Sequence, residues 1–128
     1  MKPKINFITL SVTDLEESIS FYKNVFGFPV SDKSENLCLF ELLDNFYLTI
    51  QTRSEFFDQA ENDNADVLSA GFILSHTAAS RFEVDDVVEK ALEYGAIKTT
   101  SLDENWGYSV TFKDINGHHW EIVYMREQ

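Results

Sequence analysis

The fold of this chain is decided by Ile5-Asn6-Phe7-Ile8-Thr9-Leu10-Ser11-Val12-Thr13-Asp14-Leu15-Glu16, in which a strand pattern passes directly into the start of a helix. Thr13 with Glu16 fits a capping box, and Gly27 supplies a left-handed stop. Between them, apolar residues recur at spacings of three and four, which mark one face of a helix: Leu15, Ile19, Tyr22 and Phe26. The stretch therefore predicts a strand followed by a helix that ends at Gly27.

The same order occurs a second time along the chain. A strand pattern at 71–76 leads into a helix start at 80–83, and apolar residues on one helical face continue to Gly95. Three short strand candidates follow each helix, at 28–31, 37–43 and 46–52 in the first half and at 96–102, 108–113 and 119–125 in the second. Turn sequences at 44–45 and 114–117 join the last two strands of each half. The sequence predicts an α+β fold of two tandem βαβββ modules.

Length and composition are typical of one compact domain. The chain has 128 residues, of which 44% are hydrophobic and 14% aromatic, so it can build a substantial core. We expect a single domain over 1–128, with module one at about 4–53, a connector at 54–69 and module two at 70–126, because a repeated module buries its open face against its twin. Cys38, the one cysteine, lies in an apolar strand and is expected to be a small buried hydrophobe.

Charge and hydropathy limit the partners of the chain. The formal net charge of −12 argues against nucleic acid and anionic membranes, because phosphate binding requires clustered Lys and Arg. No apolar run approaches the length of a membrane span, and the beginning of the chain lacks a signal-peptide pattern. We therefore expect a cytoplasmic protein. Asp14 and Asp85 lie near the starts of the two helices, where capping is the simplest role for an acidic group.

Taken together, these motifs resemble the vicinal oxygen chelate superfamily, which contains glyoxalase I, extradiol dioxygenases and the bleomycin-resistance proteins. The small bacterial lactoylglutathione lyase-like branch is the most similar. Five stretches carry the resemblance: 8–16, Phe26-Gly27-Phe28, 82–96, Trp106-Gly107-Tyr108, and Gly117-His118-His119-Trp120-Glu121. The resemblance implies a curved eight-stranded mixed sheet around a cleft, with the helices outside. It also implies a homodimer, with modules paired within one chain or exchanged between chains.

The resemblance also implies where a metal would be held. Enzymes of this group place one ligand near the start of each module's first strand and one on each module's last strand. Carried over by register, these positions are Phe7, Thr49, Ile73 and Glu121. Catalytic zinc requires about three ligands drawn from His, Asp, Glu or Cys, and Glu121 alone qualifies. We expect no divalent metal or other cofactor, and no glyoxalase I activity.

His119 and Glu121 are the polar pair that remains. They lie two residues apart on a strand and should share its cleft side, while Trp120, Ile122 and Tyr124 face a helix. His76 should point away from the cleft. One interpretation of the pair is catalytic, because a carboxylate beside an imidazole supports acid/base chemistry. In the other, Glu121 only accepts hydrogen bonds from a ligand or the backbone, and His119 is partly exposed.

Aromatic side chains account for most of the predicted cleft lining. The expected ligand-binding residues are Phe7, Phe40, Phe46, Trp106, Tyr108, His119 and Glu121. Flat aromatic walls with a few polar groups suit a planar or amphipathic small molecule. The alternative is that these aromatic residues simply fill the core.

Three functions remain open at this stage. The first is metal-free binding of a small aromatic or amphipathic molecule in the cleft, for sequestration or sensing, similar to the bleomycin-resistance branch. The second is a metal-dependent lyase or isomerase of the glyoxalase I type, in which the metal would polarise an enediolate oxygen. The third is a metal-free enzyme that uses His119 and Glu121.

Overall fold

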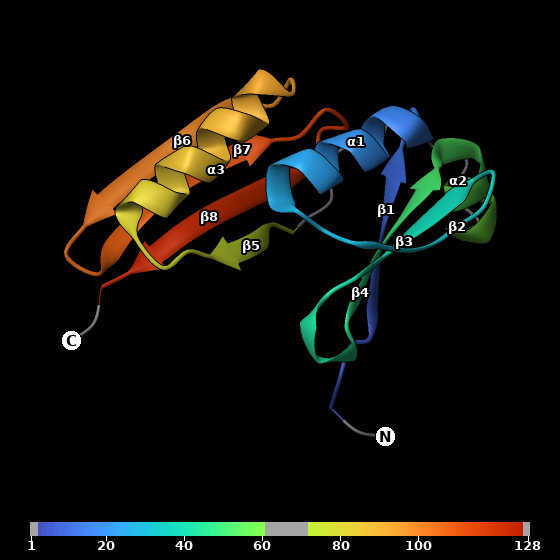
Figure 1. The fold of residues 1–128 in the computed structure, drawn as a ribbon, viewed down its shortest axis with the longest axis horizontal. Coiled ribbons are helices and arrows are strands. Elements are labelled where there is room, and N and C mark those ends of the chain that lie inside the picture. Colours follow the sequence, from blue (N-terminus) through green and yellow to red (C-terminus); the bar gives the residue numbers. More distant parts are fainter. Residues whose placement is uncertain (1–2, 61–71, 127–128) are drawn as a thin grey trace. The chain divides into compact units, whose positions relative to one another are not determined.

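The computed structural model describes residues 3–60 and 72–126, and Figure 1 shows its helices and strands. The chain divides into two compact units, Met1–Asp66 and Val67–Gln128. Each unit contains a four-stranded mixed sheet and a long helix, in the order strand, helix, three strands. The predicted α+β fold of two βαβββ modules, with eight strands in all, is confirmed.

Unit one contains the first module and a further short helix. Its elements are β1 (Phe7–Val12), α1 (Leu15–Phe26), β2 (Val30–Lys33), β3 (Leu37–Glu41), the 3₁₀ turn η1 (Leu43–Asn45), β4 (Tyr47–Thr52) and α2 (Arg53–Ala60). The strand order is β1-β4-β3-β2, with β1 parallel to β4 and the other pairs antiparallel. Helix α2 occupies the start of the predicted connector, and residues 61–69 of that connector lie outside the described residues.

Helix α1 begins one residue later than the predicted capping box requires. Asp14, not Thr13, is the N-cap, and its side chain accepts a hydrogen bond of 2.9 Å from the backbone N–H of Glu17. Gly27 ends the helix at φ 72°, as predicted. The apolar face of α1 packs against β3 and β4, and this core includes Leu15, Ile19, Phe21, Tyr22, Val25, Cys38, Phe40, Leu48 and Ile50.

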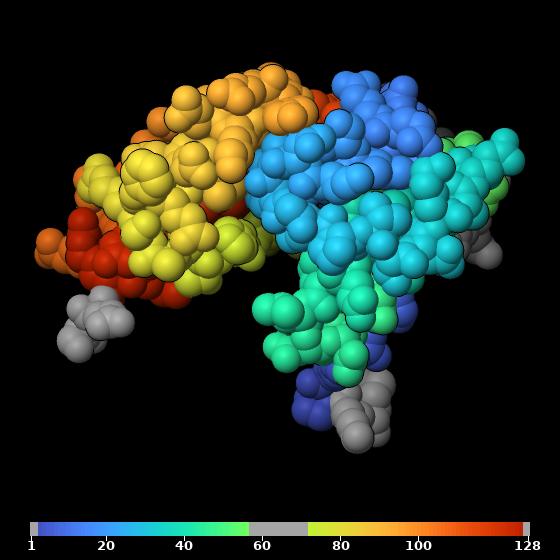
Figure 2. Space-filling model, in the orientation of Figure 1, coloured from blue at the N-terminus to red at the C-terminus, as the bar shows by residue number. Residues whose placement is uncertain are grey.

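Unit two repeats this arrangement. Its elements are β5 (Leu74–Thr77), α3 (Arg81–Glu93), β6 (Ile97–Glu104), β7 (Gly107–Lys113) and β8 (His119–Met125), in the sheet order β5-β8-β7-β6. Ser80 caps α3 by accepting from the N–H of Glu83, and the Glu83 carboxylate accepts from the N–H of Ala79. Helix α3 covers one face of the sheet, as its yellow and orange atoms show in Figure 2.

Two backbone features shape the sheet of unit two. A Cβ on Gly107 would lie 2.1 Å from the carbonyl oxygen of Tyr124, so only glycine allows β7 to approach β8 this closely. Strand β6 lies at the edge of the sheet, and all eight of its residues are exposed. Its pairing with β7 is interrupted by a bulge between Lys98 and Thr100. Among the described residues, no helix has the length and apolar character that crossing a membrane requires.

Candidate functional site

Four of the candidate site residues, Phe7, Thr49, His119 and Glu121, lie on the same kind of face in their respective sheets. We call the face opposite the long helix, α1 or α3, the distal face of that unit. Strand register assigns side chains to this face, because residues paired across neighbouring strands point to the same side. In unit one, one row across the sheet contains Leu39, Thr49 and Thr9. The next row contains Glu41, Tyr47 and Phe7.

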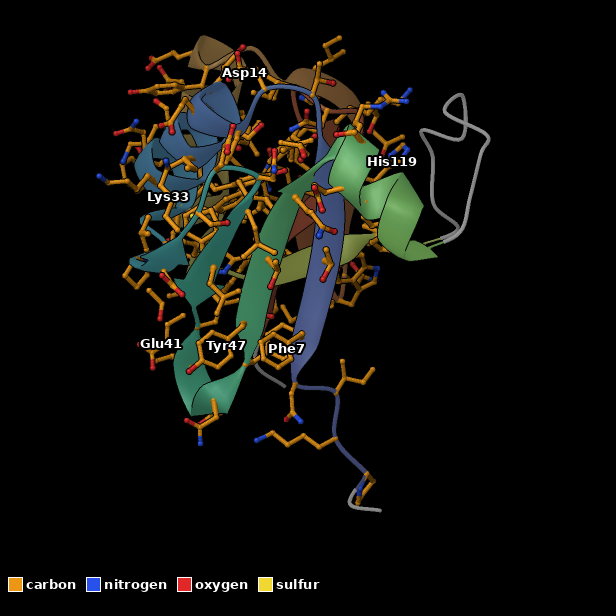
Figure 3. The ribbon with its side chains drawn as sticks, turned by 90° about the vertical axis from the view of Figure 1, so that its right-hand side faces the viewer. Phe7, Asp14, Lys33, Glu41, Tyr47 and His119 are labelled. Carbon is orange, nitrogen blue, oxygen red and sulfur yellow. The ribbon has the colours of Figure 1, made fainter. Side chains whose placement is uncertain are left out.

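An exposed aromatic pair occupies the second of these rows. The rings of Phe7 and Tyr47 stack with centroids 5.2 Å apart and planes inclined by 19°. Phe7 keeps 53% of its surface exposed, and Tyr47 is half-buried. Glu41 pairs with Tyr47 from β3, and Figure 3 shows the three side chains together at the end of the sheet far from α2. We call Phe7 and Tyr47 the aromatic platform.

Two predicted lining residues of unit one lie elsewhere. Phe40 is fully buried beneath α1, with its ring 6.0 Å from that of Tyr22 and 6.1 Å from that of Phe28. Phe46 directly precedes Tyr47 in extended backbone, so it points to the opposite side of the sheet. The prediction that Phe40 and Phe46 line the cleft is wrong, because both alternate with Leu39, Tyr47 and Thr49 and so lie on the α1 side of the sheet. Sequence reasoning missed Tyr47, although alternation from the implied ligand position Thr49 would have found it.

In unit two, a polar row crosses the middle of the distal face. Ser75, Glu121 and Thr111 are paired across β5, β8 and β7. The hydroxyl of Ser75 donates a hydrogen bond of 2.8 Å to Oε1 of Glu121. His119 and Lys113 are paired in the next row. Thr9 pairs with Thr49 as Ser75 pairs with Glu121, so the first and last strands of the two modules have equivalent registers.

His119 and Glu121 share the distal face, as their spacing predicts. Both side chains are partly buried, whereas Trp120 and Ile122 between and beyond them are buried on the α3 side. Within the described part of the chain, no hydrogen bond joins His119 to Glu121. His76 pairs with Ile122, which places it on the α3 side, away from the distal face. Acid/base chemistry by His119 and Glu121 stays a prediction.

The start of β8, and with it the position of His119, is held by Asp114. This carboxylate is buried, with 5% of the residue exposed. Its Oδ1 accepts from the backbone N–H groups of Asn116 (2.8 Å) and His118 (3.0 Å), and its Oδ2 accepts from Nε1 of Trp120 (2.9 Å). One side chain therefore ties the turn at 114–117 to the strand that presents His119 and Glu121.

Tyr108 is also absent from the distal face. Its hydroxyl donates to Oδ1 of Asp85 on α3 at 2.6 Å, and the guanidinium of Arg81 lies 4.1 Å from the ring centroid. The prediction of Tyr108 as a cleft residue is wrong, because the side chain turns toward α3. The hydrogen bond to Asp85, followed by burial, raises the pKa of Tyr108. Asp85 serves as this acceptor and does not cap the helix, whereas the capping role of Asp14 is confirmed.

Two ion pairs to Asp103 hold the β6–β7 hairpin in place near Tyr108. Arg81 forms an ion pair of 2.8 Å with Asp103, and Arg126 approaches the same carboxylate at 3.5 Å. The hydrogen bond from Arg81 is the main cause of the lowered pKa of Asp103. Trp106 lies in the hairpin turn with 41% of its surface exposed, and its carbonyl accepts from the N–H of Arg126. Trp106 thus belongs to the hairpin turn, whereas Tyr108 forms the contact of the hairpin with α3.

The residues at the four implied ligand positions do not fit a metal. Phe7 and Ile73 offer only hydrocarbon, Thr49 is a buried hydroxyl, and the carboxylate of Glu121 is already bonded to Ser75. Among the described residues, no group of three or more His, Cys, Asp or Glu side chains could hold a metal ion. Glu121 is thus a single carboxylate with hydroxyl neighbours, an arrangement that suits hydrogen bonding.

Comparison with known proteins agrees with this architecture. The model of the glyoxalase/bleomycin resistance protein/dioxygenase superfamily matches residues 4–122. The chain belongs to this superfamily. A curated relative is the metallothiol transferase FosB of Lysinibacillus sphaericus (strain C3-41), which is 29% identical over 122 residues, covering 92% of this chain and 79% of the relative.

Solved structures of other proteins share the fold. A glyoxalase-related enzyme from Fulvimarina pelagi superimposes with a TM-score of 0.85 at 21% identity, covering 95% of this chain and 88% of that one. A mutant of the fosfomycin resistance protein FosX from Listeria monocytogenes, complexed with Mn(II) and 1S,2S-dihydroxypropylphosphonic acid, gives a TM-score of 0.73 at 21% identity, covering 96% and 90%. At these identities the likeness concerns the fold alone.

Proposed function

We propose that this superfamily member binds a small planar, amphipathic molecule without a metal, and that the aromatic platform is the surface on which the molecule stacks. The observation that carries the proposal is Phe7, which replaces a metal ligand with a half-exposed ring stacked on Tyr47. Sequestration or sensing of the ligand is the corresponding role.

The surroundings of the platform support stacking. Ile5, two residues before Phe7, is 71% exposed, and Leu43 in the turn between β3 and β4 is 87% exposed. Exposed apolar residues that gather around aromatic rings commonly mark binding surfaces. A stacked ring adds about 0.5–1.5 kcal/mol beyond the apolar area that it buries. A planar ligand would gain both contributions here.

A neutral planar probe tests this proposal. The fluorescence of 2-(4-dimethylaminophenyl)benzothiazole, titrated with the protein, should rise to saturation. Replacing Phe7 by Ala should weaken binding by about three- to tenfold, the equivalent of one stacking contact. Phe82→Ala is the matched control, because Phe82 is 79% exposed on α3 and should leave the affinity unchanged. Equal affinities for the wild type and Phe7→Ala would refute the platform.

The similarity to FosB favours a second candidate, a metal-dependent enzyme. Calorimetric titration with Ni²⁺, Zn²⁺, Mn²⁺ and Fe²⁺ separates the two proposals. We expect no stoichiometric binding, and no turnover of the methylglyoxal-glutathione hemithioacetal, because Phe7 and Ile73 provide no ligand atoms. Tight binding of one metal that disappears in Glu121→Ala would overturn the metal-free proposal.

A metal-free enzyme that uses His119 and Glu121 is the third candidate, supported by their shared distal face. Its signature would be a substrate that the His119→Ala variant still binds but no longer converts. If conversion survived this substitution, His119 would have no part in the chemistry.

A further inference from the structure

We infer that the ligand of the aromatic platform carries a positive charge and that Glu41 selects it. This inference rests on the proposed function, because Glu41 acts on whatever stacks against Phe7 and Tyr47. It goes further by naming the chemical class: a planar organic cation, such as a quaternised or protonated aromatic nitrogen compound.

The position of Glu41 is set by strand register. Glu41 pairs with Tyr47 across β3 and β4, and Tyr47 pairs with Phe7 across β4 and β1. The three side chains therefore form one continuous row on the distal face, as Figure 3 shows. Directly paired residues place their Cβ atoms about 4.5–5.5 Å apart. A ligand stacked on the Tyr47 ring would lie within reach of the Glu41 carboxylate.

The carboxylate of Glu41 is also available. Glu41 is exposed, and among the described residues no cation forms an ion pair with it. Elsewhere in the same unit, Lys33 pairs with Glu16 at 2.7 Å, and the hydrogen bond to Glu16 raises the pKa of Lys33. Asp44, in the turn three residues after Glu41, adds a second acidic residue at this end of the sheet. Among residues 3–60 and 72–126, Glu41 therefore keeps its negative charge without an ion-pair partner, and Asp44 adds a second negative charge nearby.

An aromatic face beside a free carboxylate favours cations for two separate reasons. The ring attracts a cation through its quadrupole, and the carboxylate attracts it through charge. The formal net charge of −12 adds long-range attraction for the same class of ligand and repels anions. Each contribution is small at an exposed site, but all three have the same sign.

The alternative is that Glu41 only keeps the end of an exposed strand soluble. In that case its charge would not discriminate between ligands, and its removal would have the same effect as the removal of any other surface carboxylate of unit one. Glu35, exposed in the turn between β2 and β3, is such a carboxylate. Glu35→Gln changes the net charge equally and is therefore the matched control for Glu41→Gln.

Two dyes of almost equal shape provide the test. Thioflavin T is a planar benzothiazolium cation, and 2-(4-dimethylaminophenyl)benzothiazole is its uncharged counterpart. Dissociation constants for both are measured by fluorescence titration with the wild type, Glu41→Gln, Glu35→Gln and Phe7→Ala. Circular dichroism checks that each variant retains its fold.

We expect the wild type to bind the cationic dye more tightly than the neutral dye. Glu41→Gln should bind the cationic dye about threefold more weakly, while its dissociation constant for the neutral dye should equal that of the wild type. Glu35→Gln should keep the preference, and added salt should reduce it in the wild type. If both dyes bind through Phe7 but Glu41→Gln behaves as Glu35→Gln does, the charge selection is refuted while the platform stands. If Phe7→Ala changes neither affinity, the platform and the inference fall together.

Discussion

Replacing the buried Asp114 by Asn should destabilise unit two by about 2 kcal/mol. The Asp114 carboxylate accepts from two backbone N–H groups on Oδ1 and from Trp120 Nε1 on Oδ2. An Asn amide can keep its oxygen on one side only, so its NH₂ group must face an N–H donor on the other. A buried donor left without an acceptor costs about 1–3 kcal/mol. Either orientation of the amide therefore loses an amount within this range.

Urea denaturation followed by tryptophan fluorescence and circular dichroism measures this loss. Trp120→Phe removes the indole N–H, so Asp114→Asn should cost about 1 kcal/mol less in that background than in the wild type. Asp86→Asn is the matched control, because Asp86 forms an exposed ion pair of 3.4 Å with Lys90, whose loss should stay within about 0.5 kcal/mol. The reasoning would be refuted if the losses in unfolding free energy caused by Asp114→Asn and Trp120→Phe were additive. It would also be refuted if Asp114→Asn lowered the unfolding free energy no more than Asp86→Asn does.

Three further predictions concern stability and reactivity. Phe40→Ala should cost about 3–5 kcal/mol in urea denaturation, whereas Phe7→Ala should cost about 1 kcal/mol, and similar values would contradict their assignment to core and surface. Tyr108→Phe should cost about 0.5–1 kcal/mol near neutral pH. Because the pKa of Tyr108 is raised above about 10, this difference should persist below pH 10 and vanish as the pH rises through the folded-state pKa, so a difference that grows with alkalinity would refute it. The Cys38 thiol, fully buried and with its pKa raised by burial, should react with a disulfide reagent quickly in urea and slowly in buffer, and equal rates would place it at the surface.

The repeated module was predictable because its signals are local. Strand alternation, helical spacing and the stop at Gly27 need only neighbouring residues, and the structure confirms all three. The cap at Asp14 shows the limit of such signals, since Thr13 and Asp14 are both good N-caps and only the backbone geometry chooses between them.

The aromatic lining was less predictable because each strand has two faces. Phe46 was predicted to line the cleft although it alternates with Thr49, which the resemblance placed at a ligand position, so one residue of error exchanged Phe46 for Tyr47. Tyr108 depends on a partner outside its own strand, the Asp85 carboxylate on α3, which sequence spacing does not indicate. The shared strand face of His119 and Glu121 was predictable because β8 has the predicted bounds and an unbroken alternation. The cleft between the modules stays a prediction.

The exposed edge strand β6 has a consequence for the behaviour of the protein at high concentration. Unpaired backbone groups along a sheet edge can template pairing with another molecule and so begin aggregation. The bulge after Lys98 breaks the regular spacing of those groups at one end, and Asp103, held by Arg81 and Arg126, keeps charge at the other. The ion pairs of Asp103 with Arg81 and Arg126 therefore also oppose the addition of a strand from another molecule at β6. Acid or high salt weakens these ion pairs and should increase aggregation.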